Sequence, residues 1–148
     1  MKNDFSIFKH AIYNIKKSFE SFMNIKFSNY EVTAGQAQFL HILSKEDNLR
    51  QSSLSKIADC DKSYTHRVVG QLLEKQLITR LKNENDLSKL SLTEKGRLYA
   101  NDFEKYANKW QKLLLKEIGI EELKIVKKVL VMLSQKALKI INNMEKKK

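Results

Sequence analysis

Apolar residues recur at helical spacing near both ends of the chain. In each region they follow one another at alternating steps of three and four residues. This spacing places each set on one face of an amphipathic helix. The two stripes consist of Phe5, Phe8, Ile12, Ile15, Phe19 and Phe22, and of Leu123, Val126, Leu130, Leu133, Ala137, Ile140 and Met144.

A third stripe, rich in aromatic residues, predicts another long helix before the last one. Two interpretations of the three stripes are open. They can form the core of an ordinary helical bundle, or they can pack against a second copy of the chain. The third stripe consists of Tyr99, Phe103, Tyr106, Trp110 and Leu113.

The middle of the chain predicts three shorter helices. Thr33 and Gln36 have the spacing of a capping box, which opens the first. Residues 54–58 indicate a short second helix, and Asp61 is a candidate N-cap for the third. The inner face of that third helix would consist of Thr65, Val68, Val69 and Leu72.

The pattern changes after Gln76 and predicts a β-hairpin. Residues 77–81 are alternating and contain β-branched side chains, residues 82–88 are polar, and residues 89–92 form a second short strand. Thr93 then caps the aromatic-striped helix. This order is that of a winged helix-turn-helix, so we expect a mainly α fold with a small β-hairpin wing.

Composition narrows the function only slightly. The 148 residues suit one domain, or a reading lobe with an association lobe, and the net charge of +11 attracts polyanions. Residues 90–148, however, hold 14 basic and seven acidic residues, an excess of +7. The excess in residues 62–89, six basic and three acidic, is only +3. Charge alone therefore does not decide for nucleic acid.

Several classes of protein are not supported. No apolar run approaches the roughly 20 residues of a membrane span, and the first residues lack a signal-peptide pattern, so we expect a cytoplasmic protein. Cys60 is the only cysteine, and His10, His41 and His66 lack partners at metal-ligand spacing. No catalytic grouping is present, so we expect neither an enzyme nor a metal site nor a cofactor.

The predicted third helix carries the residues suited to nucleic acid. The second helix of a helix-turn-helix lies in the DNA major groove, and its polar side meets the base edges. Arg67 suits guanine and Gln71 suits adenine, while the start of the helix suits phosphates. The candidate DNA contacts on this helix are Lys62, Ser63, Tyr64, His66, Arg67 and Gln71.

Residues 32–100 resemble the MarR family of winged-helix regulators. The resemblance is carried by residues 33–43, 54–58 and 63–80, and most specifically by Leu77-Ile-Thr-Arg80 followed by Leu92-Thr-Glu-Lys-Gly96. It implies a homodimeric regulator, most often a ligand-responsive repressor, that binds a pseudo-palindrome in double-stranded DNA. Residues 33–93 would then be the DNA-binding domain, and residues 1–32 and 94–148 the dimerisation region.

The resemblance also assigns further residues. Wing and supporting DNA contacts would be Arg80, Lys82, Lys89, Ser52 and Ser53. The dimer interface would include Phe5, Phe8, Ile12, Ile15, Leu123, Val126, Leu130, Leu133 and Ile140. A pocket for a small aromatic or lipophilic effector would draw on Phe39, His41, Tyr99 and Trp110, although a core role suits each of these four better.

The chain departs from the family pattern in the wing. Glu84 and Asp86 stand where the family usually has an Asp-x-Arg pair, which puts minor-groove contact in doubt. Gln76 replaces a glycine often found before the first wing strand, so we expect a less tight turn or a left-handed residue elsewhere. For Cys60 we favour a small buried hydrophobe over a redox switch.

Two rival functions remain open. An acidic wing tip and a modest local charge are compatible with a winged-helix protein-interaction module that lacks specific DNA binding. A Lys-rich amphipathic last helix is compatible with a membrane-surface protein, but its stripe lacks an interfacial tryptophan. We favour the DNA-binding regulator over both.

Overall fold

The computed structural model describes residues 2–46, 48–80 and 89–145, with side chains from Ser6 onward. It divides into two compact units, Met1–Gln111 and Lys112–Lys148. The first unit holds most of the secondary structure and the whole of the hydrophobic core described below. The elements of the chain are α1 (Lys2–Lys26), α2 (Ala34–Lys45), β1 (Leu49–Arg50), α3 (Gln51–Ile57), α4 (Lys62–Glu74), β2 (Ile78–Arg80), β3 (Lys89–Leu92), α5 (Glu94–Leu114) and α6 (Ile120–Glu145).

Three of the predicted helix starts are confirmed in atomic detail. Thr33 and Gln36 form both halves of the capping box at α2. The Tyr64 backbone N–H donates to Asp61 Oδ1 at 2.7 Å, so Asp61 caps α4. The Gly96 backbone N–H donates to Thr93 Oγ1 at 3.0 Å at the start of α5. Local sequence therefore determines where these helices begin, because each cap satisfies a backbone N–H that the helix leaves unpaired.

The sheet has one strand more than the hairpin that the sequence predicts. β3 lies in the centre and pairs antiparallel with β2 on one side and with β1 on the other. β1 has only two residues, Leu49 and Arg50, which pair with Leu90 and Lys89. Two residues are too few to show an alternating pattern, so sequence periodicity gives no sign of this strand.

The core lies where α2, α3, α4 and the sheet meet. The inner face of α4 is buried as the sequence predicts, with Thr65, Val68, Val69 and Leu72 at most 3% exposed. The four buried residues of α4 lie on one face of the helix, so the core holds α4 by that face only. The other fully buried large side chains come from the neighbouring elements. They are Met23, Val32, Phe39, Leu40, Leu54, Leu77, Ile78 and Leu90.

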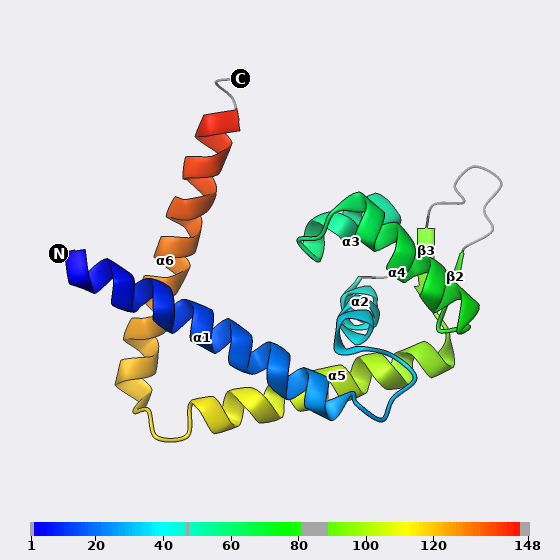
Figure 1. The fold of residues 1–148 in the computed structure, drawn as a ribbon, viewed down its shortest axis with the longest axis horizontal. Helices are drawn as coiled ribbons and strands as arrows, with labels where there is room; N and C mark the ends of the chain where they lie inside the picture. Colours follow the sequence, from blue (N-terminus) through cyan, green and yellow to red (C-terminus); the bar gives the residue numbers. More distant parts are fainter. Residues whose placement is uncertain (1, 47, 81–88, 146–148) are drawn as a thin grey trace. The chain divides into compact units, whose positions relative to one another are not determined.

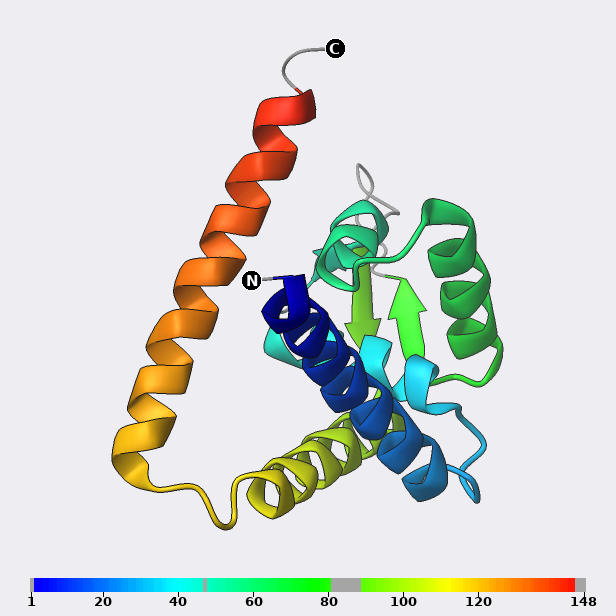
Figure 2. The same cartoon turned by 60° about the vertical axis from the view of Figure 1, so that its left-hand side comes forward.

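Aromatic rings join α1 to α5. Phe19 of α1 lies edge-on to Phe103 and Trp110 of α5, with ring centroids 6.3 and 5.1 Å apart. Phe27, just after α1, lies edge-on to Tyr106 and tilted against Phe103, with ring centroids 5.8 and 6.3 Å apart. Part of the N-terminal apolar stripe therefore packs against part of the aromatic stripe within one chain. Figures 1 and 2 both show α1 crossing α5.

The turn between α4 and β2 is tight. Gln76 has a φ of 57°, in the left-handed region. The expectation that a left-handed residue would sit elsewhere is therefore wrong, since Gln76 itself adopts it. The chain then passes so close to α5 that a Cβ added to Gly96 would lie 1.9 Å from the Leu77 carbonyl oxygen. Only glycine fits that position.

α6 belongs to the second unit and carries apolar side chains on its surface. None of its residues is buried, and Val126, Leu130 and Ile140 are between 48% and 60% exposed. No described helix is long and apolar enough to cross a membrane.

Candidate nucleic-acid interface

The outer side of α4 carries exposed polar side chains. Lys62, Ser63, His66, Arg67 and Gln71 are all exposed, opposite the buried inner face. A helix held by one face only presents the other to a partner, and side chains of this kind are donors and cations. The structure therefore places five of the six predicted contacts of this helix on one accessible surface.

Tyr64 is the exception among these six residues. Its ring is half-buried and packs edge-on against Phe39, with centroids 6.1 Å apart. The Arg67 guanidinium lies over the same ring, 5.2 Å from its centroid. Tyr64 does not simply project outward as expected; it supports Arg67 from below, because a cation is attracted to the face of an aromatic ring.

Gln51 connects three elements beside this surface. Its Nε2 lies 3.3 Å from His66 Nδ1, and its Oε1 accepts from Arg80 Nη2 at 3.4 Å. These contacts link the start of α3 to α4 and to the end of β2. Nothing in the local sequence pattern around Gln51 separates it from an ordinary surface glutamine.

A shallow hollow of about 240 Å³ opens between α3 and α4. It is lined by Gln51, Ser52, Ser55, Lys62 and Thr65. The Ser55 and Thr65 hydroxyls donate to backbone carbonyls of their own helix turns, at 2.9 Å each. The Lys62 ammonium and the exposed Ser52 hydroxyl are then the groups suited to an anion here. Ser53 is half-buried and does not line the hollow.

A chain of amide contacts fixes the orientation of Gln71. Lys75 Nζ and the Thr33 backbone N–H both donate to Gln36 Oε1, at 3.1 and 3.2 Å. Because these two groups can only donate, that atom of Gln36 must be the oxygen. Gln36 Nε2 then donates to Gln71 Oε1 at 2.7 Å. The free end of Gln71 is therefore its NH₂ group.

This orientation changes what Gln71 can recognise. A bidentate contact with adenine requires both the amide oxygen and the amide nitrogen. Gln36 Nε2 occupies one lone pair of the Gln71 oxygen and fixes the amide, so the NH₂ group is the part of Gln71 best placed to meet an acceptor such as guanine O6 or N7, thymine O4 or a phosphate.

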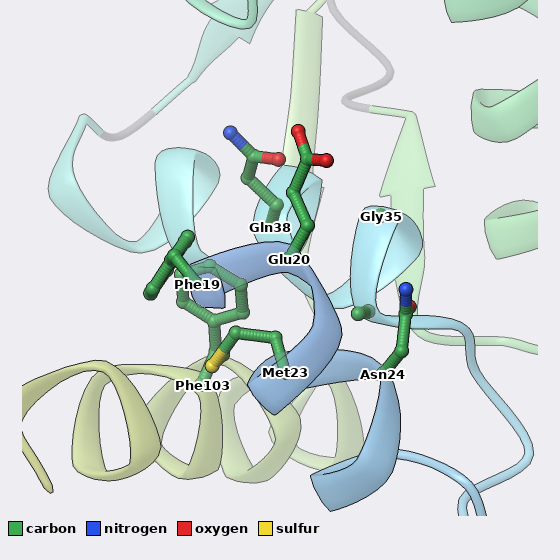
Figure 3. Close-up of a pocket in the computed structure, with 8 residues that line it drawn as sticks. Phe19, Glu20, Met23, Asn24, Gly35, Gln38 and Phe103 are labelled. Atoms are coloured by element: carbon green, nitrogen blue, oxygen red, sulfur yellow. The ribbon is translucent and has the colours of Figure 1, made fainter. Parts of the chain in front are cut away.

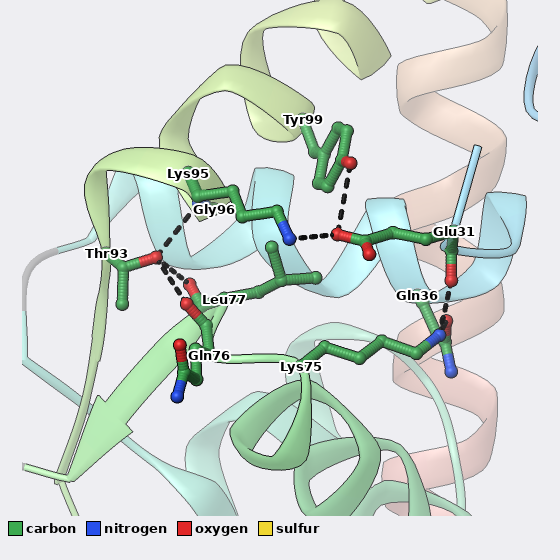
Figure 4. Close-up of polar contacts among 9 residues, drawn as sticks. All are labelled: Glu31, Gln36, Lys75, Gln76, Leu77, Thr93, Lys95, Gly96 and Tyr99. Carbon is green, nitrogen blue, oxygen red and sulfur yellow. Dashed lines mark hydrogen bonds and ion pairs between the residues drawn. The ribbon is translucent and has the colours of Figure 1, made fainter.

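The end of α4 is tied to the start of α5 through Glu31 (Figure 4). Lys75 Nζ also donates to the Glu31 carbonyl oxygen. The Glu31 carboxylate pairs with Lys95 at 2.5 Å and accepts from the Tyr99 hydroxyl at 3.1 Å. The hydrogen bond from Lys95 lowers the pKa of Glu31. These contacts hold the end of α4 against the start of α5.

The wing is described only at its base. Arg80 is exposed at the end of β2, and Lys89 is half-buried at the start of β3. Lys82, Glu84 and Asp86 lie outside the described residues, so their predicted roles stay predictions.

A second hollow, of about 250 Å³, lies between α1, α2 and α5 (Figure 3). Phe19, Met23 and Phe103 give it an apolar wall, and Glu20, Asn24 and Gln38 a polar one. None of the four residues predicted for an effector pocket lines it. Phe39 is buried in the core, and the ring centroid of His41 lies 5.1 Å from that of Phe103. The Tyr99 hydroxyl donates to the Glu31 carboxylate, and Trp110 Nε1 donates to Ser18 Oγ at 3.4 Å.

Cys60 lies in the turn before α4 and packs partly against the core. Burial raises the pKa of its thiol, and the nearby Asp59 and Asp61 raise it further. The thiol is therefore held in its less reactive form. Among the described residues, no group of three or more His, Cys, Asp or Glu side chains is placed to hold a metal ion.

The residues predicted for a dimer interface lie on α1 and α6, each described here by itself. On α1, Phe8, Ile12 and Ile15 are 40–48% exposed. On α6, Leu123 and Leu133 are half-buried and Val126, Leu130 and Ile140 are exposed. The side chain of Phe5 lies outside the described residues.

Comparison with protein families supports the resemblance found in the sequence. The MarR family model matches residues 32–87, from just before α2 to just before β3. A comparison with curated protein sequences gives no match.

Solved structures with the same fold cover nearly the whole chain. A MarR transcriptional regulator from Methanosarcina mazei Go1 is 27% identical, covers 91% of this chain and 99% of its own, and has a TM-score of 0.79. MepR from S. aureus, solved as a DNA complex, is 22% identical with a TM-score of 0.74, over 86% of this chain and 94% of its own. A mutant MarR from E. coli, complexed with operator DNA, is 19% identical with a TM-score of 0.74, over 90% and 97%. The predicted resemblance and the predicted winged-helix fold are confirmed.

Proposed function

Starting from a winged helix-turn-helix that matches the MarR family over residues 32–87, we propose that this chain is a transcriptional regulator that binds specific double-stranded DNA as a homodimer. The observation that carries the proposal is the outer side of α4, where Lys62, Ser63, His66, Arg67 and Gln71 are exposed on a helix fixed by its other face. The two similar structures solved with DNA are in keeping with it.

Affinity and specificity would come from different groups. Lys62 and Ser52, at the hollow between α3 and α4, are suited to phosphates, which position a protein on the duplex without reading its sequence. Arg67, supported on the Tyr64 ring, and Gln71, with its NH₂ group free, are suited to base edges. Arg80 and Lys89 at the wing base would add backbone contacts.

The dimer is proposed on the uncovered apolar side chains of α1 and α6. Exposed Phe, Ile, Val and Leu at helical spacing are costly in water and are the usual mark of an association surface. Two copies related by a two-fold axis would present two α4 helices to successive major grooves, about 34 Å apart. The target would then be a pseudo-palindrome.

An effector of small aromatic or lipophilic character belongs to the same proposal. The hollow between α1, α2 and α5 is the better place for it than the four residues named from the sequence, because its apolar wall is already formed. A ligand there would act by favouring one spacing of the two reading helices over another. With such a ligand the regulator would act as a repressor that leaves its operator. Neither an enzymatic activity nor a cofactor is part of the proposal.

The first test is the affinity for DNA selected by the protein from a random duplex library. We expect affinity to fall on the order of 10³-fold between 50 and 200 mM salt, since several phosphates lose their counterions on binding. Arg67→Ala should cost roughly 1–3 kcal/mol on the selected duplex and relax the preference at one position in each half-site. Arg97→Ala, an exposed arginine on α5, is the matched control and should bind as the wild type does.

One result would correct the role given to Arg67, and another would contradict the proposed function. An equal loss for all sequences in Arg67→Ala would show that Arg67 only positions the protein. If the chain selects no DNA, and a pull-down recovers only a protein partner whose binding does not depend on salt, the interaction module would be favoured instead. The acidic Glu84 and Asp86 of the wing are the sequence feature that keeps this second function open.

A further inference from the structure

Gly70 lies away from both ends of α4, on the helix face that points away from the core. It precedes Glu74 by four residues and follows Arg67 by three and Ser63 by seven. These spacings place it on the same strip of the helix as those three exposed side chains, opposite the buried Val68, Val69 and Leu72. A glycine therefore occupies the middle of the surface that the proposed function assigns to DNA.

Nothing inside the described chain requires a glycine at this position. Its φ is not positive, so the backbone conformation is one that any residue adopts. A Cβ added there would meet no heavy atom of the described residues within 4 Å. Gly96 and Gly35 differ, because an added Cβ would lie 1.9 Å from the Leu77 carbonyl oxygen and 3.1 Å from the Tyr64 hydroxyl, respectively.

A glycine here also makes the helix harder to form. Glycine is the least favourable residue in a helix interior apart from proline, because it loses the most backbone freedom on folding. An alanine at the same place would fit the monomer and strengthen α4. The described residues thus give no physical reason for Gly70, and the helix propensity of glycine is a reason against it.

The missing side chain has one consequence for a partner. His66 and Arg67 stand one turn before Gly70 and Glu74 one turn after it, so the helix surface between them is lowered to its backbone. A helix with its side chains is about 10–12 Å across, and the major groove is about 12 Å wide. In so close a fit, one methyl group on the outer strip would hold the helix away from the base pairs.

We infer that Gly70 is the point of closest approach between α4 and the base edges of the DNA major groove. This inference rests on the proposed function. Its general basis is that glycine is used where a backbone must come close to a ligand. The neighbouring contacts by Arg67 and Gln71 would depend on it, because both side chains reach the bases only if the helix axis lies deep enough.

The test compares stability and DNA affinity in the same variant. Gly70→Ala should raise the Tm by about 2–4 °C, the usual gain for glycine to alanine in a helix interior of a chain of this size. The same variant should bind the duplex selected by the wild type roughly 10-fold or more weakly, as overpacking does at a close contact. Gly70→Leu should bind more weakly still, with a Tm at or above that of the wild type.

Gly119→Ala serves as the matched control. It adds the same methyl group in the turn before α6, where the added Cβ would meet only the flexible end of the Glu122 side chain, at 3.0 Å. Its DNA affinity should equal that of the wild type.

The possible outcomes separate the two proposals. If the wild type selects no duplex at all, the proposed function fails. If the wild type binds and Gly70→Ala is more stable but binds equally well, the close approach is refuted. A lower Tm in Gly70→Ala would also refute it, since that would reveal a need for glycine within the fold. A repeated selection with Gly70→Ala should return a different base at one position in each half-site; an unchanged sequence bound more weakly would place the approach at a phosphate and overturn the assignment to base edges.

Discussion

Single residues on and around α2, α4 and α5 show which side-chain contacts can be predicted from the neighbouring sequence. Asp61, Thr33 and Thr93 cap their helices as their types and positions indicate, because a cap depends on groups within a few residues. The roles of Tyr64 and Gln71 depend on Phe39 and Gln36, which lie more than twenty residues away in the chain. The orientation of these two side chains could therefore not be predicted from the residues next to them in the chain.

Gln76 provides a prediction at the scale of one residue. It adopts a φ of 57°, a conformation that costs an ordinary L-residue roughly 1–2 kcal/mol and glycine almost nothing. Glycine also gives the unfolded chain more conformational entropy, which offsets part of this gain. Gln76→Gly should therefore raise the free energy of unfolding by about 0.5–1 kcal/mol. Chemical denaturation of the two proteins measures this difference.

Gln76→Ala is the control for this substitution. It removes the same side chain but keeps a Cβ, so it should give no gain in stability. An equal gain from Ala and Gly would show that the glutamine side chain, and not its backbone conformation, is the source of the cost.

At the scale of elements, the packing of α2 on α5 contains a half-buried titratable group, His41. The ring of His41 lies 5.1 Å from that of Phe103, and its Nδ1 is buried without a hydrogen-bond partner among the described residues. Burial lowers the pKa of His41, and the Lys45 ammonium lowers it further. Glu104, which pairs with Lys45 at 2.7 Å, and the Ala100 backbone act in the opposite direction.

This contact predicts a loss of stability in mild acid. The usual pKa of histidine is about 6.5. Since the folded-state pKa is lower, the unfolded chain takes up a proton first as the pH falls. The free energy of unfolding should therefore decrease from about pH 6.5 down to the folded-state pKa of His41. Thermal unfolding at a series of pH values between 7.5 and 5.5 measures the slope.

Two variants without a titratable ring check the assignment to His41. His41→Leu and His41→Gln should both show a smaller fall in Tm over this pH range, whatever their Tm at pH 7.5. If both keep the slope of the wild type, another group is responsible for the acid sensitivity.

The helices and strands themselves differ in how far they could be predicted. The long helices and the β2–β3 pair follow from periodicity and from β-branched content. β1 did not follow, because a two-residue strand forms only when Leu49 and Arg50 meet Leu90 and Lys89 from forty residues further on. The same holds for Gln51, whose importance lies in joining α3, α4 and β2.

At the scale of the whole molecule, the apolar surface of α6 is the feature that bears on association. Its apolar residues lie on more than one face of the helix, since Val131, Met132 and Leu138 are exposed in addition to the main stripe. A helix with so many exposed apolar side chains is suited to association. The proposed dimer gives this surface a partner.

A charge introduced into the apolar stripe of α6 tests the dimer. Leu130→Glu places a carboxylate in the main apolar stripe and should convert the protein to a monomer, because a buried unpaired charge is strongly destabilising. Affinity for the selected duplex should fall by two orders of magnitude or more, on the order of the gain that linking two sites provides. Analytical ultracentrifugation and DNA titration on the same samples measure both effects.

Lys128→Glu is the matched control, because Lys128 is exposed and lies off the stripe of Val126, Leu130 and Leu133. It should remain a dimer. A Leu130→Glu protein that stays dimeric would contradict the assignment of this stripe to the interface. The α2–α4 lobe has its own core, so its far-ultraviolet circular dichroism should persist in both variants.

The helices, their caps, the hairpin, the inner face of α4 and the resemblance to the MarR family could all be predicted from the amino-acid sequence. All of these depend on residue type at short, regular spacing, which a linear chain displays in full. The tertiary structure alone decided which side chains of α4 are free. Tyr64 is used against Phe39, the oxygen of Gln71 is used by Gln36, and Gly70 is left open, since each depends on what the fold brings within a few ångströms.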